Sequence, residues 1–235
     1  MKLIKTLLVS LSIIALAACD KSGAITEAAT STPPKSSNAV TYTPEMFKTD
    51  GLTIVAGQDY KLIANPQPVA AGTTEVTEFF WYGCPHCFRL EPALKVWKKT
   101  LPTDVKFTRY HVDLGGQTGI HQKMYFAIKA LNKNEELDPK VFDALAFNPQ
   151  AFNDAAAAKT FGTSNGIDAA TWDKAYGGFD SNANIAAVKG MVESFGIEGV
   201  PAIIVNGKYL VGGESVRTLQ VVNKLIEMDK AAAPK

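Results

Sequence analysis

Residues 76–99 read VTEFFWYGCPHCFRLEPALKVWKK, and this stretch decides the fold. Its first six residues are aromatic or β-branched apart from one glutamate, and they do not alternate cleanly, as expected of a strand buried on both faces. After the Cys-Pro-His-Cys sequence, large apolar side chains recur at helical spacing as far as Trp97. The two cysteines, Cys84 and Cys87, therefore lie where a strand passes into a helix.

Patterns on both sides of this stretch predict an α/β fold. Further strands are expected at residues 60–63, 105–112, 202–205 and 208–211. Asn206-Gly207 forms a two-residue hairpin turn between the last two strands, and an amphipathic helix at 215–228 closes the chain.

The sequence between the third and fourth expected strands has only helical periods, at residues 120–133, 139–147, 153–161, 169–176 and 185–195. Residues 59–112 and 191–235 together have the length of one small α/β domain. We therefore predict that residues 113–190 are an all-helical insertion in that domain.

The N-terminus has the pattern of a secretory signal peptide over residues 1–18. Lys2 and Lys5 precede a ten-residue apolar run, which is too short to span a bilayer as a helix. The following Leu-Ala-Ala-Cys sequence resembles the bacterial lipobox, which implies a lipid on Cys19 and, from Asp20, retention at the inner membrane. The alternative is that Cys19 ends an ordinary signal peptide.

Residues 19–58 are predicted to be a flexible tether that carries the lipid. Residues 21–38 are Ser, Thr, Ala and Pro with almost no large apolar side chain, and Pro33-Pro34 opposes a helix. Such a tether would hold a folded domain away from a membrane while allowing it to reorient.

Composition excludes several classes of protein. The 235 residues are 46% hydrophobic and 20% charged, with 24 basic against 23 acidic residues. A nucleic-acid binder that relies on a strongly positive domain is excluded on this ground. With three cysteines, the chain is also no small disulfide scaffold.

The Cys-Pro-His-Cys sequence has the residues that thiol chemistry needs. A cysteine at a helix N-terminus faces free N–H groups and the positive end of the helix dipole, which favours the Cys84 thiolate. Cys87 lies one turn later and is the resolving thiol, while His86 adds a donor or a positive charge. The alternatives are an inert disulfide or half of a zinc site, but only His111, His121 and acidic residues remain as further ligands, so no metal or cofactor is expected.

Four features together resemble the DsbA group of thioredoxin-fold disulfide oxidoreductases. They are Pro85-His86 between the cysteines, Glu78 six residues before Cys84, Pro92 five residues after Cys87, and Val200-Pro201 before the final hairpin. The resemblance covers residues 59–230 and implies a thioredoxin fold with an inserted helical domain. Pro92 should kink the helix or mark its end at Glu91.

The resemblance also implies roles for individual residues. Glu78, buried in its strand, would exchange protons with Cys87 through water, although a solvent-facing glutamate is the alternative. Pro201 would be a cis-proline facing the cysteines, with the Val200 backbone pairing with an extended substrate. The alternative is a trans proline that starts an edge strand.

The expected activity is oxidation of unfolded secreted proteins with free thiols by a monomer in the bacterial periplasm, anchored to a membrane through its lipid. By resemblance, a DsbB-like, quinone-linked membrane protein would reoxidise it. The alternatives are a reductase or isomerase of the same fold, or a lipoprotein chaperone without net redox activity. His111, His121, Trp81 and Trp172 are interpreted as structural or surface residues.

Overall fold

The computed structural model describes residues 40–70 and 72–232, and residues from Thr41 onward belong to one unit. The predicted signal peptide, Cys19 and the tether up to residue 39 lie outside the described residues.

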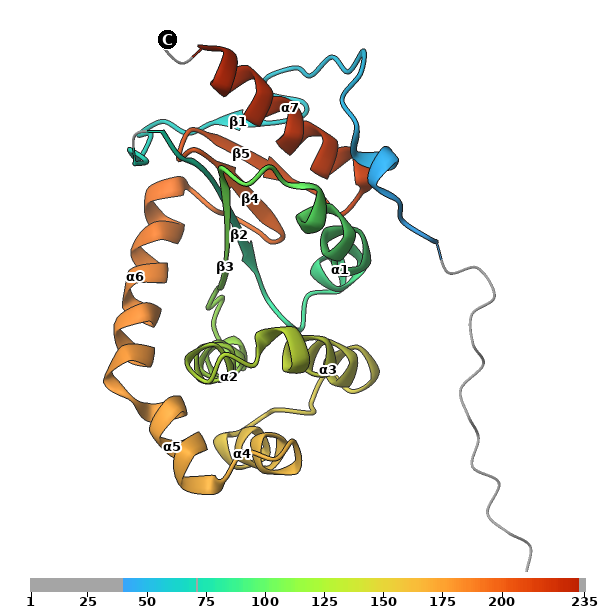
Figure 1. Cartoon of the computed structure of the whole chain (residues 1–235). Helices are drawn as coiled ribbons and strands as arrows, with labels where there is room; N and C mark the ends of the chain where they lie inside the picture. Colours follow the sequence, from blue (N-terminus) through green and yellow to red (C-terminus); the bar gives the residue numbers. More distant parts are fainter. Residues whose placement is uncertain (1–39, 71, 233–235) are drawn as a thin grey trace, which may run out of the picture. The chain divides into compact units, whose positions relative to one another are not determined.

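Five strands form one mixed sheet in the order β1-β5-β4-β2-β3 (Figure 1). They are β1 (Lys61–Leu62), β2 (Thr74–Phe80), β3 (Val105–His111), β4 (Ala202–Val205) and β5 (Tyr209–Gly212). β2 and β3 are parallel and joined through helix α1 (Pro85–Trp97), whereas the other neighbours are antiparallel. All five predicted strands are confirmed, with ends shifted by one or two residues. Helix α1 continues through Pro92, so the alternative that it ends at Glu91 is wrong.

Helices cover both faces of the sheet. Apolar side chains of α1 and α7 (Val216–Ala232) share one core cluster with Ile203 and Val205 of β4. Ala202 and Ile204 belong to a second cluster, which includes side chains of α6 and the other inserted helices. Because β4 is buried on both faces, its sequence is apolar throughout rather than alternating.

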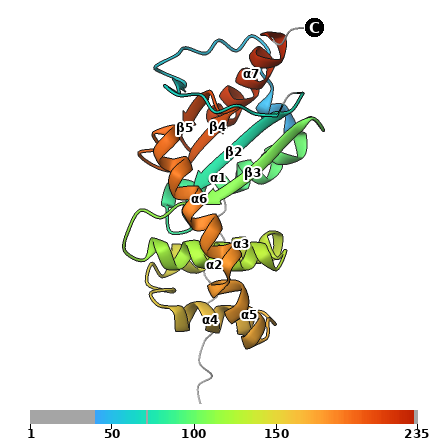
Figure 2. The same ribbon diagram turned by 90° about the vertical axis from the view of Figure 1, so that its left-hand side faces the viewer.

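Five helices lie between β3 and β4, as the helical periods predict. They are α2 (Thr118–Ala130), α3 (Asn134–Phe147), α4 (Ala155–Ser164), α5 (Ala169–Gly177) and α6 (Phe179–Phe195). Figure 2 shows α2 to α5 beyond one end of the sheet, with α6 running back along it. Residue 190, where the insertion was expected to end, lies inside α6. The helix ends at Phe195, as its period predicts, and Gly196, with a φ of +63°, forms the left-handed C-cap that glycine favours.

Residues 41–58 pack on the folded unit, so the prediction that the flexible tether extends to residue 58 is wrong for this part. A short 3-10 helix, η1 (Pro44–Phe47), places Phe47 in the core cluster of α1 and α7, where it is 2% exposed. Asn223 of α7 donates a hydrogen bond to the Phe47 carbonyl at 2.8 Å. Packing of Phe47 and hydrogen bonds from α7, a helix far along the chain, therefore dock this segment.

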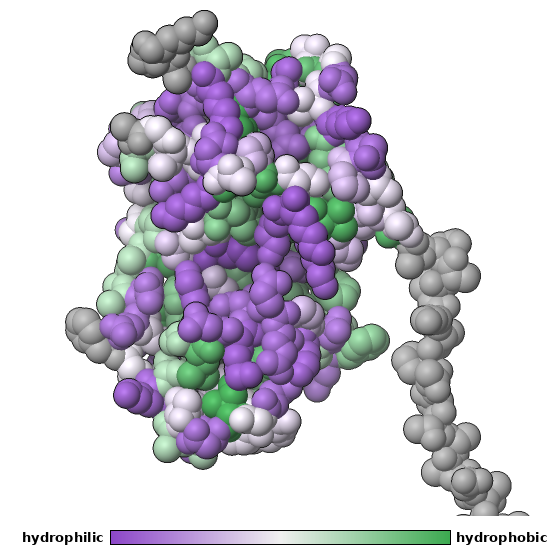
Figure 3. Space-filling view, viewed as in Figure 1, coloured by the Kyte–Doolittle hydropathy of each residue, from purple (hydrophilic) through white to green (hydrophobic). Residues whose placement is uncertain are grey.

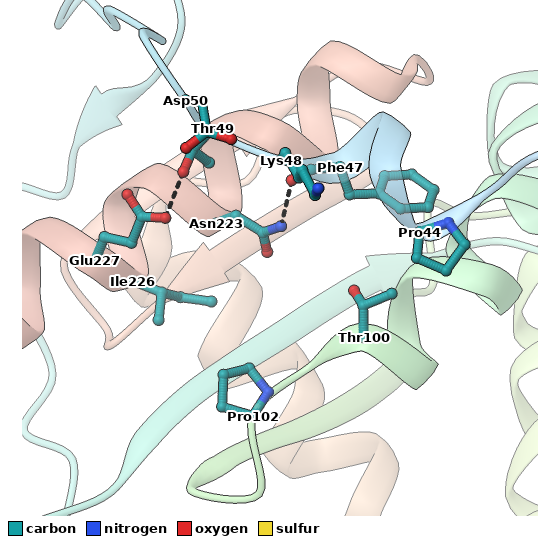
Figure 4. A pocket seen from close by; sticks show the side chains of 10 residues that line it. All are labelled: Pro44, Phe47, Lys48, Thr49, Asp50, Thr100, Pro102, Asn223, Ile226 and Glu227. Carbon is teal, nitrogen blue, oxygen red and sulfur yellow. Dashed lines mark hydrogen bonds between the residues drawn. The ribbon is translucent and has the colours of Figure 1, made fainter.

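A pocket of about 430 Å³ opens beside this docked segment (Figure 4). Its walls come from residues 44–50, the end of η2 (Lys98–Thr100), Pro102 and α7. The Thr49 hydroxyl donates to Glu227 of α7 across it. None of its lining residues belongs to the Cys-Pro-His-Cys motif.

Replacing Phe47 by alanine should lower the free energy of unfolding by about 3–5 kcal/mol, the usual cost of removing a buried phenylalanine. The measurement is urea unfolding of the full chain. Val55→Ala is the matched control from the same segment, because Val55 is 47% exposed, and it should change stability by no more than about 0.5 kcal/mol. Equal effects of the two substitutions would show that the segment is not docked.

Candidate active site

Cys84 is the N-cap residue of α1. Its sulfur accepts a hydrogen bond from the Cys87 N–H at 3.4 Å, and its own N–H donates to the Trp81 carbonyl at 3.0 Å. Cys84 is 5% exposed and Cys87 is fully buried, and both are free thiols. The strand-to-helix junction predicted from the sequence is thus where the structure places the pair.

The two thiols differ strongly in acidity. A hydrogen bond from the Cys87 thiol, supported by the backbone N–H groups of Cys87 and His86 and by the His86 charge, lowers the pKa of Cys84 to about 6. Burial, followed by the hydrogen bond to Cys84, raises the pKa of Cys87 well above its usual value. At neutral pH the pair therefore contains one thiolate, on Cys84, and one thiol.

The loop before Cys84 donates hydrogen bonds to two buried histidines. The Tyr82 N–H donates to His111 Nε2 at 3.1 Å, and the Trp81 indole N–H donates to His121 Nδ1 at 2.9 Å. Burial lowers the pKa of both histidines, which keeps them neutral. A Cβ on Gly83 would lie 2.5 Å from the Trp81 ring, so this position requires glycine. The histidines and Trp81 are structural, in agreement with the sequence interpretation.

Val200 and Pro201 lie beside the active cysteine. Their peptide bond is cis, as the resemblance implied, and Pro201 is buried just before β4. The Cys84 sulfur lies 3.5 Å from the Val200 carbonyl, to which it can donate only while it is protonated. A residue more than a hundred positions away thereby contacts the reactive sulfur.

Glu78 is fully buried in β2, which excludes the solvent-facing alternative. Its partner in the sheet register is Arg109 of β3, whose Nε lies 2.7 Å from Glu78 Oε2. Neither Glu78 oxygen nor this Nε has a partner with hydrogen-bond geometry, so the contact is an ion pair without an aligned N–H. Burial raises the pKa of Glu78 to about 7, although Arg109 opposes the shift.

Arg109 is the centre of a cluster that the sequence analysis did not identify. Its guanidinium also pairs with Glu91 of α1, lies 3.9 Å from Asp138 of α3, and sits 4.1 Å from the centre of the Phe80 ring. Although burial opposes the charge, Glu78 and the other two carboxylates hold the pKa of Arg109 well above its usual value. A basic residue in the middle of an aromatic strand was the signal that could have pointed to it.

Pro85 and His86 occupy the first turn of α1. Pro85 is the first helical residue, where its missing N–H removes no helical bond. The His86 side chain is 61% exposed, and its Nδ1 lies 2.9 Å from Glu214, a residue that the sequence analysis also missed. His86 therefore lies at the rim of the site, in contact with the loop after β5.

Neither a metal group nor a spanning helix is found in residues 40–70 and 72–232. This part of the chain contains no group of three His, Cys, Asp or Glu residues arranged to hold a metal ion, and none of its helices is long and apolar enough to cross a membrane. On the face shown in Figure 3, hydrophilic side chains predominate and hydrophobic ones form small, separated groups.

A buried thiol one turn from an acidic thiol, whose sulfur lies against the Val200 carbonyl, is an arrangement for dithiol–disulfide exchange. Comparison with known proteins agrees. The model of the DSBA-like thioredoxin domain family matches residues 75–222. The chain belongs to this family.

Other DsbA-like proteins resemble it over most of their length. The thiol:disulfide interchange protein DsbA of Azotobacter vinelandii is 34% identical over 184 residues, which are 76% of this chain and 86% of that protein. The crystal structure of Pseudomonas aeruginosa DsbA matches with a TM-score of 0.73 at 31% identity, covering 77% of this chain and 97% of that one. NmDsbA1 of N. meningitidis matches with a TM-score of 0.65 at 28% identity, covering 77% and 97%.

The thioredoxin fold implied by the sequence is thereby confirmed, and this DsbA-like chain is a protein thiol:disulfide oxidoreductase.

Proposed function

We propose that this DsbA-like protein is an oxidase that introduces disulfide bonds into secreted proteins in the bacterial periplasm. The observation that carries the proposal is the acidity of Cys84, whose pKa of about 6 stabilises the reduced form of the pair at neutral pH. Stabilising the reduced form makes the corresponding disulfide a stronger oxidant.

Each catalytic cycle transfers two electrons. A substrate thiolate attacks the Cys84 sulfur of the Cys84–Cys87 disulfide, which forms a mixed disulfide and releases Cys87 as a thiolate that takes up a proton. A second substrate thiolate then attacks the substrate sulfur of the mixed disulfide, which forms the substrate disulfide and releases the Cys84 thiolate. Cys84 is the better leaving group because its pKa is the lower of the two.

Glu78 and Val200 have supporting roles in this proposal. Glu78 supplies and removes the Cys87 proton through water, a role supported by a pKa of about 7 and by the contribution of its charge to the raised pKa of Cys87. The Val200 backbone, which contacts the Cys84 sulfur, pairs with an extended substrate segment and holds it beside the disulfide.

Reoxidation needs a partner that accepts two electrons. We propose a DsbB-like membrane protein that takes both electrons from the Cys84 thiolate and the Cys87 thiol, re-forms the disulfide and passes the electrons to a quinone, which takes up the Cys87 proton and one proton from solvent. A lipid on Cys19 would keep the monomer close to that partner at the inner membrane.

The pH dependence of the glutathione equilibrium tests the oxidase proposal. The protein disulfide reacts with two glutathione thiols to give the dithiol and glutathione disulfide. Above the Cys84 pKa of about 6, this exchange also releases one proton, because Cys84 is left as a thiolate. The equilibrium constant should therefore be flat below pH 6 and rise about tenfold per pH unit between about pH 6.5 and 8.5.

Trapping of free thiols at each pH measures this constant. A constant that does not change up to pH 8 would show that the Cys84 thiol has an ordinary pKa. This result would favour a reductase or isomerase. Absence of exchange at any pH would leave the chaperone alternative.

A further inference from the structure

The Nδ1 atom of His86 has two partners that it cannot satisfy at once. Glu214 Oε2 and the Arg89 NH2 group each lie 2.9 Å from it. With a proton on Nδ1, the ring donates to the carboxylate, whereas without it the ring accepts from the guanidinium. Whether Nδ1 carries a proton therefore decides which neighbour the ring binds.

Glu214 reaches this position from outside the active-site helix. It follows Gly213 in the loop between β5 and α7, and Gly213 has a φ of +111°, at which a Cβ would lie 2.7 Å from the Thr218 hydroxyl. The same hydroxyl accepts from the Ser215 N–H at 3.4 Å. A turn at the start of α7 thus presents the carboxylate to the Cys-Pro-His-Cys motif.

Arg89 binds the Glu214 carboxylate and is also the second possible partner of the His86 ring. Its Nε donates to the same Glu214 oxygen at 2.9 Å. The hydrogen bond from Arg89, followed by that from His86, lowers the pKa of Glu214 and keeps it ionised. Two charged groups thus contact the ring, the Glu214 carboxylate and the Arg89 guanidinium, and the His86 charge in turn helps to lower the pKa of Cys84.

We propose that Glu214 is a positioning residue of the redox site, which accepts a hydrogen bond from His86 Nδ1 and so holds the ring in place within the Cys-Pro-His-Cys turn. The inference rests on the oxidase function proposed above. It assigns to Glu214 the part that the third residue has in a nucleophile–histidine–carboxylate arrangement. The Cys84 pKa already depends in part on the His86 charge.

The alternative is that Glu214 forms only an ordinary surface ion pair with His86 and Arg89. The side chains of His86, Arg89 and Glu214 are 61%, 52% and 33% exposed, and exposed pairs contribute little to stability. The two alternatives differ in the glutathione equilibrium constant. A positioning role changes this constant through His86, whereas a surface ion pair does not change it.

The test is the glutathione equilibrium of the full protein at pH 7 in wild type and Glu214→Gln. Loss of the carboxylate charge weakens the contacts of Glu214 with His86 and Arg89, so the ring is no longer held in the orientation in which its charge favours the Cys84 thiolate. The equilibrium constant for reduction should fall about two- to fivefold, in keeping with an exposed charge pair. A direct repulsion between Glu214 and Cys84 would raise the constant instead, which would overturn the proposal, as would no change.

A double-mutant cycle tests whether Glu214 acts on Cys84 through His86. In a His86→Asn background, the Glu214→Gln substitution should leave the constant unchanged, whereas an effect of the same size in both backgrounds would overturn the proposal. Glu136→Gln is the matched control, since Glu136 is a half-exposed glutamate bound by Lys133 and Lys140 on α3, and it should not alter the constant.

The wild-type pH profile keeps this inference distinct from the oxidase proposal. A wild-type constant that does not rise above pH 6 contradicts the proposed function. A normal wild-type profile that Glu214→Gln reproduces contradicts the inference about Glu214 alone.

Discussion

Replacing Cys84 by serine is expected to reduce disulfide transfer to the rate measured without protein. The attacked sulfur and the leaving thiolate are both lost, and the remaining Cys87 is fully buried with a raised pKa. The measurement is disulfide formation in a reduced two-cysteine peptide, with the wild-type protein added in its oxidised form. Retained transfer by Cys84→Ser would assign the reactive sulfur to another residue.

Cys87→Ser is the matched variant, because it keeps a hydroxyl that can donate to the Cys84 sulfur in place of the thiol. With a pKa of about 6, about nine-tenths of Cys84 is ionised at pH 7. Cys87→Ser should therefore alkylate with iodoacetamide at least about tenfold faster than Cys84→Ser. Comparable rates would contradict the assignment of Cys84 as the thiolate.

The same pair of variants separates the oxidase from a chaperone. A chaperone would prevent aggregation of an unfolded protein equally well after either substitution. An oxidase loses its activity on the two-cysteine peptide, whatever its affinity for unfolded chains.

Replacing Arg109 by methionine is expected to cost about 3–5 kcal/mol of stability at pH 7, because it leaves charges in the interior without their partner. The side chain of Arg109 is 11% exposed, and it is the cation that faces Glu78, Glu91 and Asp138. Urea unfolding of the reduced protein measures the loss. Lys106→Met on the same strand is the control, since Lys106 is 68% exposed and pairs with Glu75 at the surface, and it should cost no more than about 1 kcal/mol.

The cost of Arg109→Met should also depend on pH. Burial already raises the pKa values of Glu78 and Asp138 in the folded protein, and loss of the guanidinium raises them further. A group with a raised folded pKa adds stability as the pH falls through that value toward the unfolded value. In the variant Glu78 takes up its proton at a higher pH than in wild type, so the difference should shrink as the pH falls from about 9 to about 7, the wild-type pKa of Glu78, and adding Glu78→Gln should recover part of it at pH 7. A pH-independent loss would mean that packing, not charge, is responsible.

The sequence determined most of the local structure and the identity of the reactive pair. Strand and helix periods depend on residues near one another in the chain, as do the helix N-terminus at Cys84 and the turn at Asn206-Gly207. The place of Glu78 in an apolar strand left its burial open, the family resemblance implied it, and the structure confirms it. These features need no knowledge of which strands are neighbours.

Only the tertiary structure decided which distant groups share an environment. The register of β2 and β3 places Glu78 opposite Arg109, and the docking of α3 adds Asp138 to the same guanidinium. Phe47 falls within the predicted flexible tether. Only its contact with a helix about 175 residues later shows that it is docked. Glu214 meets His86 across 128 residues for the same reason. Contacts of this kind depend on how elements pack, and no local pattern in the sequence records that packing.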